Sequence, residues 1–226
     1  MDPDVLRQAP LFKRLETEAA ASLAAAMTTI HLDRGEVLFH EGDTGDQLYV
    51  VVSGKIKLGR SGSAGRENLL AVLGPGQMFG ELSLFDPGPR STTASAVTPA
   101  DLKSVQHDEL IEWLTGRPEV ARGLLGQLAG RLRHANDVVS DLVFSDVPGR
   151  VAKALLDLAS RFGEPAPTGG LNVHHDLTQE ELAQLVGASR ETVNKTLADF
   201  AARGWIRLEP RSVTILDIER VERRAR

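Results

Sequence analysis

Short apolar segments separated by glycine-bearing turns fill the chain between about residues 28 and 106. Three of these segments are Leu48–Val52, Lys55–Leu58 and Leu69–Leu73, and the turns around them read EGDTGD, SGK, SGSAG and GPGQ. Regular short strands with such punctuation predict an antiparallel sandwich or barrel. The preceding stretch, Val5–Met27, is rich in Ala and Leu and predicts a helical lead-in.

The period changes between Pro118 and Phe144, where apolar residues recur at alternating intervals of four and three. The repeat consists of Ala121, Leu125, Leu128, Leu132, Ala135, Val139 and Leu142. One interpretation is a helix packed on its own domain, and the other is a dimer interface between two such helices. The stripe is narrower than the buried face of an ordinary core helix, which favours the dimer.

The segment SDVPG, residues 145–149, interrupts this helix. Proline suits the first turn of a new helix, and Asp146 is placed to cap it. We therefore expect a hinge and a domain boundary here, followed by a helix from Pro148 to Phe162 and an exposed loop over Gly163–Gly170.

The C-terminal third has the pattern of a helix-turn-helix. Thr178 and Glu181 form a capping box, Gly187 ends the first helix, and Ser189 can cap a second one. Apolar residues predict one buried face across the pair: Leu182, Leu185, Val186, Val193, Leu197 and Phe200.

Polar residues at the start of the second helix are candidates for contact with bases. Arg190 can bond guanine and Glu191 can accept from cytosine, and both precede Thr192 and Lys195 on the outward side. A β-hairpin wing is expected over residues 205–215. The alternative is a pair of helices with a solvated charged face.

Composition narrows the function classes. The net charge of −5 argues against a protein that binds polyanions over its whole surface. Residues 148–226 carry 12 Lys and Arg against 11 Asp and Glu, so any nucleic-acid binding is expected to be local and in the C-terminal third. The chain has no cysteine, which excludes iron–sulfur and cysteine-ligated metal sites. No apolar run reaches the length of a membrane span and no signal peptide begins the chain, so a cytoplasmic protein that does not enter membranes is expected.

The stretch FGELSLFDPGPRS, residues 79–91, places Glu81 nine residues before Arg90. The two side chains can form a salt bridge or hold one small ligand between them. An enzyme is not expected, because the chain shows no nucleophile elbow and no metal-spaced His/Asp cluster. Haem sensing stays open as an alternative, although the six histidines form no evident pair.

These motifs together resemble the bacterial cyclic-AMP receptor (CRP/FNR) family of transcription regulators, particularly its actinobacterial branch. The resemblance rests on SGKIKL, FGELSLFDPGPRS, RLRHAND, SDVPGR and DLTQEELAQLVGASRETVNK, and it covers nearly the whole chain. It implies an α+β architecture of three parts. These are a cyclic-nucleotide-binding β-roll with an N-terminal helix over residues 1–117, a dimerisation helix over 118–144, and a winged helix-turn-helix DNA-binding domain over 145–226.

The resemblance also implies the ligand site. Backbone N–H groups at Gly80–Leu82 with Arg90 and Ser91 would hold the cyclic phosphate, Glu81 would accept from the ribose 2′-OH, and Arg131 would close on the phosphate region. The full set implied for cAMP is Leu58, Leu70, Ala71, Phe79, Gly80, Glu81, Leu82, Arg90, Ser91, Thr92, Arg131, Leu132, Ala135 and Asn136.

The chain departs from the family at the residues of the long helix that contact the adenine base of cAMP. The family usually has Thr-Ser or Thr-Asn on the long helix, whereas this chain has Ala135-Asn136. Alanine forms no hydrogen bond with its side chain, which weakens the case for adenine recognition. A DNA binder with weak or no cAMP dependence, either constitutive or answering another effector, is therefore the second hypothesis.

The expected function is a cAMP-responsive transcription regulator that binds TGTGA-like inverted repeats as a homodimer and contacts RNA polymerase. The resemblance implies that ligand at the dimer helix reorients the recognition helices through a hinge at Asp146. It implies a DNA-binding set of Val147, Thr178, Gln179, Ser189, Arg190, Glu191, Thr192 and Lys195. The dimer interface would comprise Ala121, Leu125, Leu128, Leu132, Val139 and Leu142.

Overall fold

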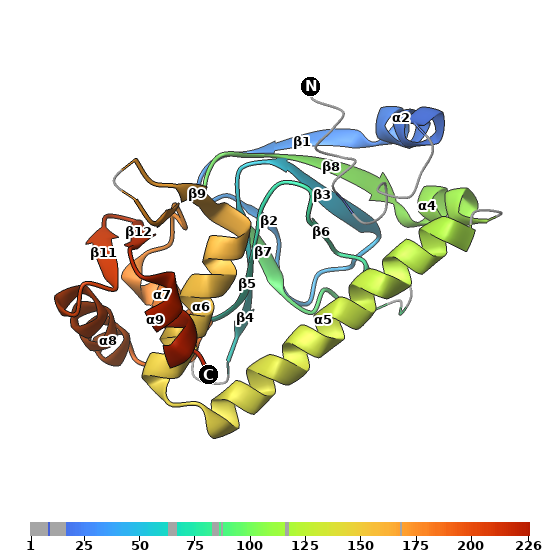
Figure 1. Cartoon of the computed structure of the whole chain (residues 1–226). Helices are drawn as coiled ribbons and strands as arrows, with labels where there is room; N and C mark the ends of the chain where they lie inside the picture. Colours follow the sequence, from blue (N-terminus) through green and yellow to red (C-terminus); the bar gives the residue numbers. More distant parts are fainter. Residues whose placement is uncertain are drawn as a thin grey trace. The chain divides into compact units, whose positions relative to one another are not determined.

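The computed structural model describes residue 9 and residues 17–62, 67–82, 86, 88–115, 118–167 and 169–226. It divides into two compact units, residues 1–61 with 71–134, and residues 62–70 with 135–226. The expected α+β class is confirmed, with a strand-rich N-terminal part, a long helix and a helical C-terminal part (Figure 1).

Two four-stranded antiparallel sheets form the N-terminal part (Figure 1). The first has the order β1-β8-β3-β6, and the second has the order β2-β7-β4-β5. The strands of the first sheet are β1 (Thr28–Leu32), β3 (Gln47–Ser53), β6 (Met78–Phe79) and β8 (Ala100–Gln106). Those of the second are β2 (Val37–Phe39), β4 (Ile56–Ser61), β5 (Glu67–Leu73) and β7 (Thr93–Ala96).

The continuous apolar run in β3 is explained by burial on both faces of its sheet. Leu48 and Val50 join one core cluster with residues that precede β1 and follow β8, whereas Tyr49 and Val51 join a second cluster with residues of the other sheet. Alternate residues of a strand point to opposite faces, so a strand covered on both sides needs apolar residues throughout.

Helices precede and follow the strands of these sheets in the sequence. The predicted lead-in is observed as α2 (Thr17–Ala26), while residues 5–8 and 10–16 of that prediction lie outside the described residues. Helix α4 (His107–Leu114) follows β8, and α5 (Pro118–Phe144) has the bounds that the sequence predicts. No helix of the described part is long and apolar enough to cross a membrane.

The C-terminal part contains four helices among its described residues (Figure 1). They are α6 (Val147–Phe162), α7 (Gln179–Val186), α8 (Arg190–Ala202) and α9 (Ile218–Arg224). The predicted wing is observed as β11 (Ile206–Glu209) paired with β12 (Ser212–Ile215).

The region expected as an exposed loop after α6, residues 163–170, begins with a short strand, and a second strand follows the region directly. They are β9 (Gly163–Pro165) and β10 (Leu171–Val173), and β10 pairs with β12 to extend the wing to a four-stranded sheet. Pro165 is tolerated because β9 lies at the edge, where a missing N–H breaks no ladder. Three-residue strands flanked by Gly and Pro have too little periodicity for the sequence to reveal them.

Candidate functional site

Arg90 is a buried cation at the centre of the candidate ligand site. Its main chain is fixed by hydrogen bonds with Gly42 and Asp43, at 2.8 and 2.7 Å, and only 6% of the residue is exposed. The guanidinium donates to the carbonyl oxygens of Gln47 (2.9 Å) and Gly80 (3.2 Å). A buried charge needs compensation, and these carbonyls supply a part of it.

Two aromatic rings supply another part. The Arg90 guanidinium carbon lies 4.4 Å from the centre of the Phe39 ring and 5.5 Å from that of Tyr49, within the range of cation–π attraction. Tyr49 in turn stacks on Phe79. Burial raises the pKa of the Tyr49 phenol, and the nearby Arg90 charge opposes that rise.

Two glycines leave room for the Arg90 side chain. A Cβ atom on Gly45 would lie 2.8 Å from Arg90 Nε, and one on Gly80 would lie 2.9 Å from Arg90 Nη1. Gly80 also has φ +83°, a left-handed conformation that side-chain-bearing residues rarely adopt. Glycine at position 80 therefore has a structural reason, because it lets the Arg90 side chain approach the main chain.

Glu81 is paired with Arg131 of α5. Arg131 Nη1 donates to Glu81 Oε1, and Arg131 Nη2 donates to the carbonyl oxygen of Met78. The Glu81 residue is 1% exposed, and its second carboxylate oxygen, Oε2, is buried with no hydrogen-bond partner among the described residues. A buried carboxylate oxygen left without a donor is costly, so this atom fits a hydroxyl group of a bound ligand.

The other residues implied for the ligand site lie in varied environments. Phe79 belongs to the core between the sheets, with Leu58 and Ala71 packed against that core, and Thr92 is half-buried. The exposed members of the set are Leu70, Leu82, Ser91, Leu132, Ala135 and Asn136. Residues 83–85 and 87 of the stretch after Gly80 lie outside the described residues.

The apolar repeat of α5 is largely uncovered in the single chain. Leu125 and Leu132 are both 64% exposed, Val139 is 62% exposed and Leu142 is 53% exposed. Ala121 and Leu128 are half-buried, and Ala135 is exposed. A monomeric soluble protein rarely leaves such a stripe in water, so its exposure fits a surface that another chain covers.

The caps predicted for the helix-turn-helix are present. Thr178 and Glu181 form both bonds of the capping box, Gly187 ends α7 in the left-handed conformation, and the Ser189 hydroxyl accepts from the Thr192 N–H at 3.2 Å. The predicted inward residues Leu182, Val186, Val193, Leu197 and Phe200 are buried, whereas Leu185 is half-buried.

Arg190, Glu191, Thr192 and Lys195 are all exposed on the first two turns of α8. Gln179 and Thr178 are exposed at the start of α7, and Val147 is half-buried at the first position of α6. The Asp146 carboxylate accepts from the Gly149 N–H at 3.0 Å, which confirms it as the cap of α6.

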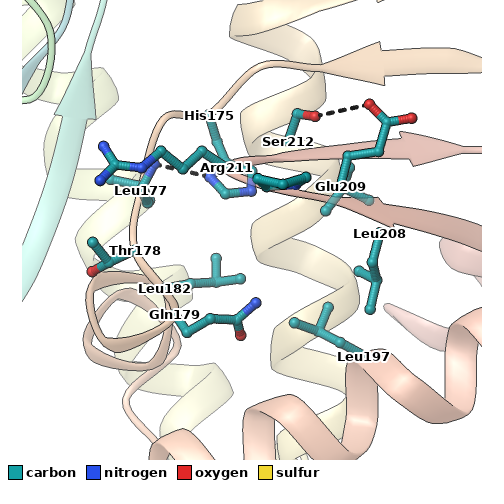
Figure 2. Close-up of a pocket in the computed structure, with 12 residues that line it drawn as sticks. His175, Leu177, Thr178, Gln179, Leu182, Leu197, Leu208, Glu209, Arg211 and Ser212 are labelled. Carbon is teal, nitrogen blue, oxygen red and sulfur yellow. Dashed lines mark hydrogen bonds between the residues drawn. The ribbon is translucent and has the colours of Figure 1, made fainter.

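A cavity of about 230 Å³ that the sequence does not suggest lies between the start of α7 and the wing (Figure 2). Leucines from three elements line it, with polar groups such as Gln179 and Ser212 beside them. Arg211, which lines the cavity, and Asp176 both have positive φ, and the Asp176 N–H donates to the Arg211 carbonyl at 2.9 Å.

Two protein families match separate parts of the chain. Residues 29–116 match the cyclic nucleotide-binding domain, and residues 149–224 match the Crp-like helix-turn-helix domain. A Mycobacterium tuberculosis protein described as a CRP-like cAMP-activated global transcriptional regulator is 55% identical over 223 residues, which are 99% of each chain. This chain belongs to the CRP/FNR family, in its actinobacterial branch.

Other proteins are similar to this chain along most of its length. The cyclic AMP receptor protein of Thermus thermophilus is 36% identical over 217 residues, which are 96% of this chain and 97% of that protein. The crystal structure of the Thermus thermophilus catabolite activator protein covers 96% of this chain and 98% of its own, with a TM-score of 0.56. The structure of FixK2 from Bradyrhizobium japonicum is 25% identical, covers 87% and 96%, and has a TM-score of 0.77.

This CRP/FNR regulator therefore combines a cyclic nucleotide-binding domain with a DNA-binding domain. Its homologues are transcription regulators, not enzymes, as the sequence predicts. Sequence reasoning missed the aromatic surroundings of Arg90, because Phe39 and Tyr49 come from two different strands and no local pattern brings them together.

Proposed function

We propose that the chain is a cAMP-responsive regulator that binds DNA as a homodimer. The observation that carries the ligand assignment is the buried Oε2 atom of Glu81, which has no hydrogen-bond partner in the described part of the chain and lies in the same stretch as the buried Arg90 guanidinium. A cyclic nucleotide offers a ribose hydroxyl to the first and a singly charged phosphate to the second. The cAMP-activated relative from Mycobacterium tuberculosis supports this choice of nucleotide.

In this proposal each residue has a simple task. Arg90 neutralises the cyclic phosphate by charge-assisted hydrogen bonds, and N–H groups after Gly80 complete its shell. Glu81 Oε2 accepts from the 2′-OH, and Arg131 orients the carboxylate through its hydrogen bond to Oε1. Ligand binding in turn biases the geometry of α5 and thereby the orientation of the recognition helices, as a population shift.

Calorimetric titration with cAMP and with cGMP, followed by DNA binding with and without each nucleotide, tests this function. We expect cAMP to bind and to raise the affinity for an inverted repeat of TGTGA-like half-sites. Binding of neither nucleotide, with DNA affinity unchanged, would favour the second hypothesis of a binder with weak or no cAMP dependence. That hypothesis rests on Ala135, whose side chain cannot form a hydrogen bond with the base.

The substitution Ala135→Thr is expected to supply the hydrogen bond to the base that alanine at this position cannot form. A hydroxyl at this position adds a donor and an acceptor where the family usually has them, and one added hydrogen bond corresponds to roughly a 2- to 12-fold gain in affinity. We expect calorimetry to show tighter cAMP binding of about this size. Ala129→Thr, also exposed on α5, controls for the helix propensity of threonine. Equal affinities in both variants and the parent chain would contradict a role for position 135.

The proposed homodimer buries the apolar repeat of α5 against a second copy. Leu125→Lys places two ammonium groups in that interface and removes two leucines from it, so we expect the dimer dissociation constant to rise about 100-fold or more. Sedimentation at a series of concentrations measures it. Asp137→Lys is the matched control, because Asp137 is exposed on the side of α5 opposite the repeat, and it should leave the dimer intact. An unchanged dissociation constant in Leu125→Lys would mean that the dimer interface lies elsewhere.

The proposed DNA contacts divide into base reading and positioning. Arg190, Glu191 and Lys195 reach base edges in a half-site resembling TGTGA, while groups at Thr178, Gln179 and Val147 bind backbone phosphates. Lysine at position 195 keeps a positive charge but lacks the bidentate fork of arginine, so discrimination at its base pair is weaker. The segment that follows α6, around residues 163–170, is the proposed contact for RNA polymerase.

A further inference from the structure

Arg150, on the first turn of α6, contacts three main-chain carbonyl groups that belong to two other segments. Its Nη1 atom donates to the carbonyl of Ser145 at 2.8 Å. Its Nε atom donates to the carbonyl of Val186 at 3.1 Å, and Nη2 donates to that of Gly187 at 3.3 Å. All five nitrogen-bound hydrogens of a guanidinium lie in one plane, so these three acceptors hold the side chain in one orientation.

Both segments are helix C-terminal ends. Helix α7 ends at Val186 with Gly187 as its cap, and α5 ends at Phe144, immediately before Ser145. Carbonyl groups at such ends lack partners within the helix and carry the negative end of the helix dipole. One guanidinium therefore satisfies the ends of two helices, which ties the end of α5 to the turn that leads into α8.

Two further contacts join the same elements. Lys153 of α6 forms an ion pair with Asp141 in the last turn of α5. Leu142 lies against the turn, because a Cβ atom on Gly187 would lie only 3.1 Å from its Cδ2 atom. The last turn of α5, α6 and the helix-turn-helix turn are thus held as one body, although Ser145 and Asp146 interrupt the helix between them.

We propose that Arg150 is the positioning residue that makes the recognition helix α8 follow the last turn of α5. The proposal rests on the proposed function, in which a ligand acts on α5, and it adds how that action reaches the DNA-binding surface. A change in α5 is transmitted to α8 only if the connection between them is stiff. Without the three carbonyl contacts the helix-turn-helix rotates about residues 145–146, and part of the ligand's effect is lost.

A distance measurement tests the stiffness without any ligand. The chain has no cysteine, so Ser140→Cys on α5 and Ala202→Cys on α8, both at exposed positions, give two unique sites for spin labels. Labelled chains diluted with unlabelled ones report the distance within one protomer. We expect a single narrow distribution in the parent, a broad one with Arg150→Met, and an intermediate one with Arg150→Lys, which keeps the charge but loses the fork.

Arg223→Met is the matched control for charge and volume. Arg223 lies in the same unit, is exposed, and donates to the Glu219 carbonyl of its own helix at 3.4 Å. Its substitution should leave the distance distribution unchanged. Equal distributions in the parent and both Arg150 variants would overturn the proposal, and the lysine variant keeps the test decisive if the methionine variant does not fold.

DNA affinity measured with and without cAMP provides the functional readout. In Arg150→Met the factor by which cAMP raises DNA affinity should fall about threefold or more, while cAMP affinity in the absence of DNA stays unchanged. A loss of DNA affinity that is equal with and without cAMP would assign Arg150 a structural role only and overturn the proposal. If cAMP has no effect on the parent chain, the proposed function fails, and the distance measurement still decides the role of Arg150.

Discussion

Replacing Arg90 by methionine is expected to abolish cAMP binding at the cAMP concentrations that saturate the unmodified protein. The substitution removes the buried cation while filling much of its volume, so the phosphate loses its charge-assisted hydrogen bonds and leaves water without compensation. Two such bonds at about 1.5–3 kcal/mol each correspond to a loss of at least about 100-fold. Calorimetric titration of the purified variant with cAMP measures it.

Arg90 also holds the carbonyls of Gln47 and Gly80, so the variant needs a check on its fold. Arg60→Met is the matched control, since Arg60 is a largely exposed residue paired with Glu41 in the same unit. It should bind cAMP as the parent does. Ligand-free DNA binding by Arg90→Met should equal that of the ligand-free parent, because the DNA-binding residues lie in the other unit. A variant that keeps its cAMP affinity would refute the assignment of the phosphate site.

Local chemistry in the sequence accounts for most of the helical elements. Pro118 and the interruption at Ser145 gave the bounds of α5, and the capping box from Thr178 to Glu181 gave the start of α7. Gly187 ended that helix as predicted. Each of these signals acts within four residues along the chain, so a single sequence contains all the information needed to recognise it.

The site depended on contacts that no local pattern contains. Glu81 pairs with Arg131, fifty residues further along the chain, and the Arg90 guanidinium lies over the rings of Phe39 and Tyr49 from two different strands. Motif spacing identified Glu81 and Arg90 as a pair but left open whether they bind each other. Sheet topology determines which rings surround the arginine, and topology follows from the packing of whole strands. The Arg150 contacts were missed for the same reason.

Replacing Arg190 by alanine is expected to weaken binding to the preferred inverted repeat and to remove discrimination at one base pair of each half-site. Arg190 is exposed on the first turn of α8, just after the Ser189 cap. A bidentate arginine–guanine contact gives about 1–3 kcal/mol of discrimination, or roughly 5- to 150-fold per half-site. Fluorescence anisotropy with labelled duplexes, at one fixed salt concentration because affinity depends steeply on salt, measures both quantities.

The discriminating experiment combines the protein variant with operator variants in which each guanine of the half-site is replaced in turn. If Arg190 bonds to a guanine, one of these replacements lowers the DNA affinity of the parent. The same replacement causes no further loss of affinity in Arg190→Ala, because the side chain that contacted that base has already been removed. Arg220→Ala removes the same charge from α9, where Arg220 pairs with Asp217, and should keep the full penalty for every replacement. Additive losses at all guanines would mean that Arg190 contacts the backbone, and the sequence preference would then have to come from Glu191 and Lys195.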